Sequence, residues 1–215
     1  TNWSSSDTGG GVAQWPNDTT HHAYFQGTGG TVTLAAGAMS SGNLYFGTDG
    51  YTLTGSGATL TLGGSPTITV TGGTATINAT LLSSTGALTK SGAGTLYITA
   101  RQYLGSSTKA INVNQGTLKL GGQPFMYSGS SINVYDTGTL DMAGLQINAN
   151  TIFNYNLYGG TLTSNSSSPI SATAGTFTAQ PGTSSTIRSG PSAYLIAPYA
   201  GYTWGNVAGA GALTV

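Results

Sequence analysis

The chain has 215 residues, of which 5% are charged, with five Lys+Arg against five Asp+Glu, 35 glycines and no cysteine. An ordinary soluble domain carries about 25% charged residues, and a protein that binds nucleic acid or an anionic membrane surface needs a basic patch that this balance does not supply. The composition therefore argues against those partners, a disulfide framework and a thiolate metal site, and the absence of an apolar run of about 18 residues argues against a membrane-spanning helix.

Residues 1–26 are rich in aromatic side chains and precede the first repeat, so we predict that they form an N-terminal cap. Aromatic bulk at the start of a stacked fold covers the first coil and protects an open sheet edge. Asp18, His21 and His22 in this segment could suggest a metal site or a general base, but adjacent residues of an extended chain point in opposite directions. We favour a polar loop and expect no metal and no cofactor.

Residues 27–190 repeat a short phrase in which a small residue and Thr are followed by apolar, polar and apolar positions. Four copies of this phrase, at Thr95, Thr117, Thr139 and Thr161, are spaced 22 residues apart. A fixed interval predicts stacked coils and disfavours the alternative, an antiparallel sandwich or jelly roll. We therefore predict an all-β fold, a parallel β-helix with coils of about 22 residues.

Alternation with period two predicts which residues of each phrase point inward and which point outward. The first apolar position after the Thr predicts an inner column of Val32, Leu60, Ala75, Leu96, Leu118, Leu140, Leu162 and Phe177. The next position predicts an exposed outer column of Tyr97, Lys119, Asp141 and Thr163. Lys119 should then lie between an aromatic ring and a carboxylate.

Residues 191–215 first lack the repeated phrase and then show it again near the end. We predict that they form one or more C-terminal coils and an end segment. The last residues, Leu213, Thr214 and Val215, repeat a phrase that opens a coil in mid-chain. Such an end would leave backbone N–H and C=O groups without partners. We therefore predict an assembly end through which copies of the chain join head to tail into a filament.

Two stretches carry a family resemblance: Leu-Thr-Lys-Ser-Gly-Ala-Gly-Thr-Leu at residues 88–96 and Ala-Ile-Asn-Val-Asn-Gln-Gly-Thr-Leu at residues 110–118. They resemble the autotransporter-associated β-strand repeat, also called the passenger-associated transport repeat. Residues 15–18, 23–25 and 27–32 are similar to the start of bacterial secreted proteins that carry these repeats. The resemblance implies a secreted or surface-displayed, right-handed β-helix that serves as a stalk, adhesin shaft or fibre, and it implies no reaction.

Three functions follow from these observations. The first is a non-enzymatic extracellular fibre subunit whose partner is another copy of itself. The alternative is a stalk or passenger fragment of a surface adhesin that binds a glycan or a host surface. A lesser alternative is an ice-binding β-helix, suggested by Thr-x-Thr pairs such as Thr31/Thr33 and Thr74/Thr76.

An enzyme is not expected, because the chain has no Glu and its aspartates are scattered along the sequence. Only Asp136 and Asp141 lie close together, and a paired-carboxylate glycosidase would have only aspartates to draw on. Glycan binding would require tyrosines aligned on one outer face. The candidates are Tyr97, Tyr103, Tyr127, Tyr135, Tyr155 and Tyr158.

Overall fold

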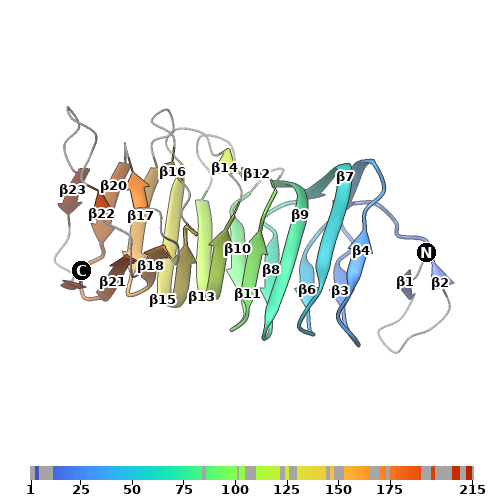
Figure 1. Cartoon of the computed structure of the whole chain (residues 1–215), viewed down its shortest axis with the longest axis horizontal. Coiled ribbons are helices and arrows are strands. Elements are labelled where there is room, and N and C mark those ends of the chain that lie inside the picture. Colours follow the sequence, from blue (N-terminus) through green and yellow to red (C-terminus); the bar gives the residue numbers. More distant parts are fainter. Residues whose placement is uncertain are drawn as a thin grey trace.

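The computed structural model describes residues 3–4, 12–83, 86–100, 102–104, 110–121, 124–125, 130–143, 146–147, 153–164, 170–172, 175–189, 195–196, 205–208 and 212–214. Every regular element in these ranges is a β-strand. The strands stack in parallel, coil upon coil, into a rod (Figure 1). The predicted parallel β-helix is confirmed, whereas its right-handed sense and its N-terminal cap stay predictions.

The described strands form three ladders along the rod. The first ladder contains β3 (Ala23–Phe25), β6 (Leu44–Phe46), β8 (Thr67–Val70), β10 (Leu88–Ser91), the first halves of β13 (Ala110–Leu120) and β15 (Ser131–Asp141), β17 (Phe153–Tyr158), β20 (Gly175–Ala179) and β23 (Gly205–Ala208). The second contains β4 (Thr31–Thr33), the first halves of β7 (Thr52–Leu62) and β9 (Thr74–Ser83), β11 (Thr95–Ile98), the second halves of β13 and β15, β18 (Thr161–Ser164), β21 (Ser184–Ser189) and β24 (Ala212–Thr214).

The third ladder contains β5 (Gly37–Ser41), the second halves of β7 and β9, β12 (Gln102–Leu104) and β14 (Pro124–Phe125). A separate parallel sheet joins β16 (Gln146–Ile147), β19 (Ile170–Ala172) and β22 (Leu195–Ile196). An antiparallel pair, β1 (Trp3–Ser4) and β2 (Val12–Ala13), precedes the rod. In the described part of the chain, no helix is long and apolar enough to span a bilayer.

The interval of 22 residues is one coil in the middle of the rod. Thr95 lies beside Thr117, Thr117 beside Thr139, and Thr139 beside Thr161. Toward the N-terminus the interval changes, because Thr31 pairs with Thr52 and Thr52 with Thr76. The coils can differ in length because the turns between strands absorb the extra residues while the strands keep their register.

The apolar residues that alternate along the strands fill the interior of the rod. Ala75, Leu96, Leu118, Leu140 and Leu162 are consecutive partners in the second ladder, and each has 0% of its surface exposed. Burying each of these leucines contributes about 2 kcal/mol of hydrophobic free energy relative to an exposed side chain.

Three residues of the predicted inner column lie in other rows. Val32 pairs with Leu53 in the second ladder, in the row that continues to Ile77, two residues away from Ala75. Leu60 lies in the third ladder, opposite Met39 and Leu81. Phe177 lies in the first ladder, opposite Tyr155. The prediction of one column was wrong for these residues, because the same phrase occurs on strands of all three ladders.

The domain boundaries at residues 26/27 and 190/191 stay predictions. β3 already pairs with β6, so the stack of coils includes residues 23–25 of the range assigned to the cap. At the other end, Leu213 and Thr214 belong to β24 and pair with Ser185 and Thr186. Val215 lies outside the described residues.

Candidate functional site

The predicted outer column is a continuous row on the second ladder. Tyr97 pairs with Lys119, Lys119 with Asp141, and Asp141 with Thr163. Nζ of Lys119 lies 4.9 Å from the centroid of the Tyr97 ring, which is a cation–π contact. One half of the expected environment of Lys119 is therefore present.

On the other side Asp141 is the neighbour of Lys119 in the row, as predicted, but Asp141 and Thr163 are buried. Their exposed fractions are 3% and 5%. Oδ1 of Asp141 accepts a hydrogen bond of 2.9 Å from the backbone N–H of Ala143. A buried carboxylate must be hydrogen-bonded, and here it closes the turn that follows its own strand. The expectation of an exposed column was therefore wrong for these two residues.

The first ladder carries a row of asparagines on its outer side. Nδ2 of Asn133 donates to Oδ1 of Asn112, and Nδ2 of Asn156 donates to Oδ1 of Asn133, both at 2.8 Å. Beside this row the rings of Tyr135 and Tyr158 stack, with centroids 4.8 Å apart and planes 12° apart. We call Asn133, Asn156, Tyr135 and Tyr158 together the amide–tyrosine face.

The other four tyrosine candidates are buried, in contact with a lysine, or outside the described residues. Tyr155 is buried among the core residues, and its burial raises the pKa of its phenol above the usual value. Tyr97 is covered by Lys119. The side chain of Tyr103 and the whole of Tyr127 lie outside the described residues. The amide–tyrosine face is therefore the place where the described structure aligns tyrosines from the predicted set.

Threonine recurs at one outer position of the second ladder. This row is Thr74, Thr95, Thr117, Thr139, Thr161 and Thr186. The neighbouring row, two residues further along each strand, holds Thr76, Tyr97, Lys119, Asp141, Thr163 and Arg188. The two adjacent threonine rows expected for an ice-binding face therefore do not extend over these coils.

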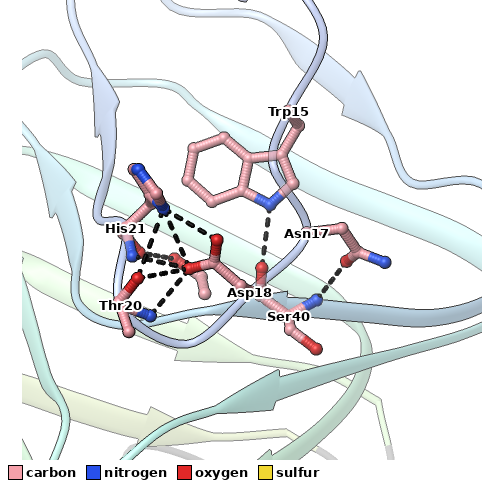
Figure 2. Close-up of polar contacts among 7 residues, drawn as sticks. Trp15, Asn17, Asp18, Thr20, His21 and Ser40 are labelled. Carbon is pink, nitrogen blue, oxygen red and sulfur yellow. Dashed lines mark hydrogen bonds and ion pairs between the residues drawn. The ribbon is translucent and has the colours of Figure 1, made fainter.

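A polar turn precedes β3 at the N-terminal end of the rod (Figure 2). The Asp18 carboxylate accepts the backbone N–H groups of Thr20 and His21 at 2.8 and 3.0 Å, and the Thr20 hydroxyl at 2.8 Å. Nδ1 of His21 lies 2.8 Å from Oδ2. These hydrogen bonds, the one from the His21 side chain first, lower the pKa of Asp18 well below its usual range.

This turn holds one carboxylate and one imidazole, with side chains 41% and 58% exposed. Among the described residues, no group of three or more His, Cys, Asp or Glu side chains could hold a metal ion. The geometry of Asp18 is that of a turn in which a side chain replaces missing backbone partners. It therefore has a direct structural role.

Sequence reasoning missed Lys90, which is 1% exposed in the interior of the rod. Its Nζ donates to the carbonyls of Ser91, Gly92 and Gln115 at 2.8, 2.7 and 3.0 Å. Removal from water lowers the pKa of Lys90 to about 8. The alternation of β10 contained the signal, because Leu88 and Lys90 share one face of the strand and Leu88 is buried.

The comparison with known proteins gives one informative relative. Over 121 residues, which are 55% of this chain, the sequence is 43% identical to the adhesin BmaC autotransporter of Brucella suis biovar 1 (strain 1330). The chain spans 3% of the length of that protein. No family model matches the chain, and no solved structure matches it. The similarity agrees with the resemblance to autotransporter passengers, whereas membership of the β-strand repeat family stays a prediction.

The similarity to an adhesin favours the alternative function over the fibre subunit. The fibre prediction depended on residues at the C-terminal end of the sequence. Two of them, Leu213 and Thr214, are in a strand that pairs with β21, and Val215 is not described. That pairing occupies one edge of β24, so the head-to-tail filament stays a prediction.

Proposed function

We propose that this chain is a passenger segment of a bacterial surface adhesin, secreted or held at the cell surface. In this proposal the β-solenoid acts as a non-enzymatic stalk and presents a binding face to a host surface. The observation that carries the proposal is the 43% identity over 121 residues to the adhesin BmaC autotransporter. The stacked coils support it, because a solenoid gains length with every added coil and needs no further domain to do so.

The environment of the aspartates supports a structural role over a catalytic one. Asp18 binds the backbone of Thr20, Oδ1 of Asp49 accepts the backbone N–H of Thr74 at 2.6 Å, and Asp141 closes its own turn. Each of these three carboxylates thus accepts a hydrogen bond from a backbone N–H. A hydrolytic enzyme would instead direct a pair of carboxylates toward one substrate bond.

The amide–tyrosine face is the surface that we propose for binding a neutral glycan. Asparagine amides donate to and accept from sugar hydroxyls, and tyrosine rings provide apolar surface next to a hydroxyl. The net charge of the chain is zero, so attraction to an anionic ligand contributes little. A neutral, hydroxyl-rich ligand matches this chemistry.

The test is the adhesion of beads coated with the purified chain to epithelial cells, together with a glycan array. The variant Tyr135→Ala/Tyr158→Ala should lose the signal in both assays. The matched control is Tyr24→Ala/Tyr45→Ala, because these two rings also lie on the first ladder, 5.6 Å apart, and form a tilted pair. A wild-type chain that binds neither cells nor glycans would contradict an adhesive role, and equal losses in both variants would contradict the proposed face.

A further inference from the structure

The strand β5 has one edge paired and one edge facing the N-terminal segment. On its paired side it lies against β7, from Gly37 opposite Ala58 to Ser41 opposite Leu62. Its sequence, Gly-Ala-Met-Ser-Ser, contains no charged residue and no proline. Natural strand edges use charge, proline or bulges to prevent pairing with another chain. β5 must therefore be protected in another way.

Two side chains occupy the second edge of β5 (Figure 2). The indole Nε1 of Trp15 donates to the Ser40 carbonyl at 2.8 Å. The backbone N–H of Ser40 donates to Oδ1 of Asn17 at 2.6 Å, and Nδ2 of Asn17 donates to the Ala38 carbonyl at 3.2 Å. One carboxamide and one indole thus make three of the hydrogen bonds that a neighbouring strand would make with Ala38 and Ser40.

The backbone around Asn17 directs its amide toward this edge. Asn17 has a φ of 56°, in the left-handed region that asparagine tolerates better than most residues. The next residue, Asp18, fixes the chain through its hydrogen bonds to Thr20 and His21. Trp15 is partly buried and packs against the hydrophobic core. The two side chains are therefore held in place from both directions along the chain.

Side chains also accept backbone hydrogen bonds in the turns that precede β3 and β6 of the first ladder. Nδ1 of His22 accepts the backbone N–H of Asn43 at 2.9 Å. One coil further on, Oδ1 of Asn43 accepts the backbone N–H of Thr67 at 2.9 Å. Side-chain acceptors thus repeat in these turns, and the segment before β3 uses the same chemistry at the edge of the stack.

We infer that Trp15 and Asn17 form a side-chain cap that prevents β5 from pairing with β5 of a second copy of this chain. Without these side chains, the N–H and C=O of Ser40 and the C=O of Ala38 would be available to an incoming strand. The second copy presents the same edge, so two β5 strands can pair antiparallel about a two-fold axis. That contact is closed, and its product is a dimer.

The decisive variant is Asn17→Gly, measured by sedimentation velocity at micromolar concentration. Glycine adopts a positive φ at no steric cost, so this change removes the carboxamide and keeps the backbone conformation. The wild type should sediment as a monomer and Asn17→Gly as a dimer. The matched control is Asn78→Gly, which makes the same chemical change on β9, where Asn78 pairs with Thr54 of β7. This control should remain a monomer.

Hydrogen exchange at the Ser40 amide gives a second measurement, and Trp15→Phe gives a second variant. The amide of Ser40 should exchange faster in dilute Asn17→Gly than in the wild type and should regain protection in the dimer. Trp15→Phe keeps an aromatic ring against the core but removes the donor to Ser40, and it should also shift the chain toward the dimer. A wild type that is already dimeric, or variants that stay monomeric with Ser40 unprotected, would overturn the inference. Higher oligomers in place of a dimer would overturn the β5–β5 contact.

Discussion

Lys90 shows at the scale of a single residue how a buried charge can join two coils. Its ammonium reaches two carbonyls of its own turn, at Ser91 and Gly92, and a third at Gln115 in the next coil. Three donors thus meet three acceptors, which satisfies the hydrogen-bonding capacity of the group. The hydrogen bonds offset only part of the cost of removing the charge from water, and the pKa of Lys90 falls to about 8 for that reason.

The lowered pKa of Lys90 predicts how stability changes with pH. The side chain titrates near 10.5 when unfolded and near 8 when folded, so between these values the unfolded state binds more protons. The free energy of unfolding of the wild type should therefore rise with pH across this window. Lys90→Met should lack that rise, as measured by urea unfolding at several pH values. Parallel profiles for the two proteins would show that the burial of Lys90 does not shift its titration.

Asp18 predicts a dependence of the same sign at acid pH, where the free energy of unfolding should also rise with pH. Its pKa is lowered in the folded chain by the His21 side chain and then by Thr20, so folding stabilises the ionised carboxylate. This contribution is present above the unfolded pKa of about 4 and is lost as the pH falls toward the lower folded value. We expect the melting temperatures of the wild type and Asp18→Asn to converge below pH about 4. A constant difference between pH 7 and pH 2 would contradict this role.

At the scale of the strand, the asparagine row predicts unequal costs for equivalent substitutions. Asn133 shares amide hydrogen bonds with both Asn112 and Asn156, whereas Asn112 is joined to this row by one. Each hydrogen bond contributes about 1 kcal/mol. Asn133→Ala should therefore destabilise the chain about twice as much as Asn112→Ala in urea unfolding. Equal costs would indicate that the amides act independently, each through its own solvent contacts.

The sequence was sufficient for the strands and the register in the middle of the rod, where the phrase returns at a constant interval. Thr95, Thr117 and Thr139 are neighbours in the structure as their spacing predicts. Where coil length varies the prediction was wrong, because Val32 and Leu60 do not belong to the column predicted for them. A local phrase identifies a strand, but only the number of residues in each turn decides which ladder the strand joins.

The side chains that carry the polar architecture were harder to predict than the strands. The burial of Asp141 depends on the turn after its strand, and the contacts of Trp15 and Asn17 join residues more than 20 positions apart. Neither leaves a periodic signal. The stack of Tyr135 on Tyr158 follows from the register of the two strands, and it could have been predicted because both tyrosines were already candidates for glycan binding.

At the scale of the whole molecule, the stacking of coils predicts that damage stays local. Leu118 is fully buried between Leu96 and Leu140, and an aspartate there would introduce an unpaired charge that costs several kcal/mol. Each coil contacts only its neighbours, so Leu118→Asp should remove hydrogen-exchange protection from β11, β13 and β15 while β6 and β8 stay protected. The control is Asn114→Asp, which changes an exposed residue of the same strand. Uniform loss of protection along the rod would show that the coils unfold as one unit.

The parallel ladders also determine how the rod would respond to tension. The hydrogen bonds between coils run along the axis of the solenoid, so a pull on its two ends loads them in their weakest geometry, one coil boundary at a time. A released coil of 22 residues, the interval between Thr95 and Thr117, would lengthen the tether by about 70 Å once extended. A chain held at both ends would therefore yield in steps and absorb work at each one, as an extensible linker does.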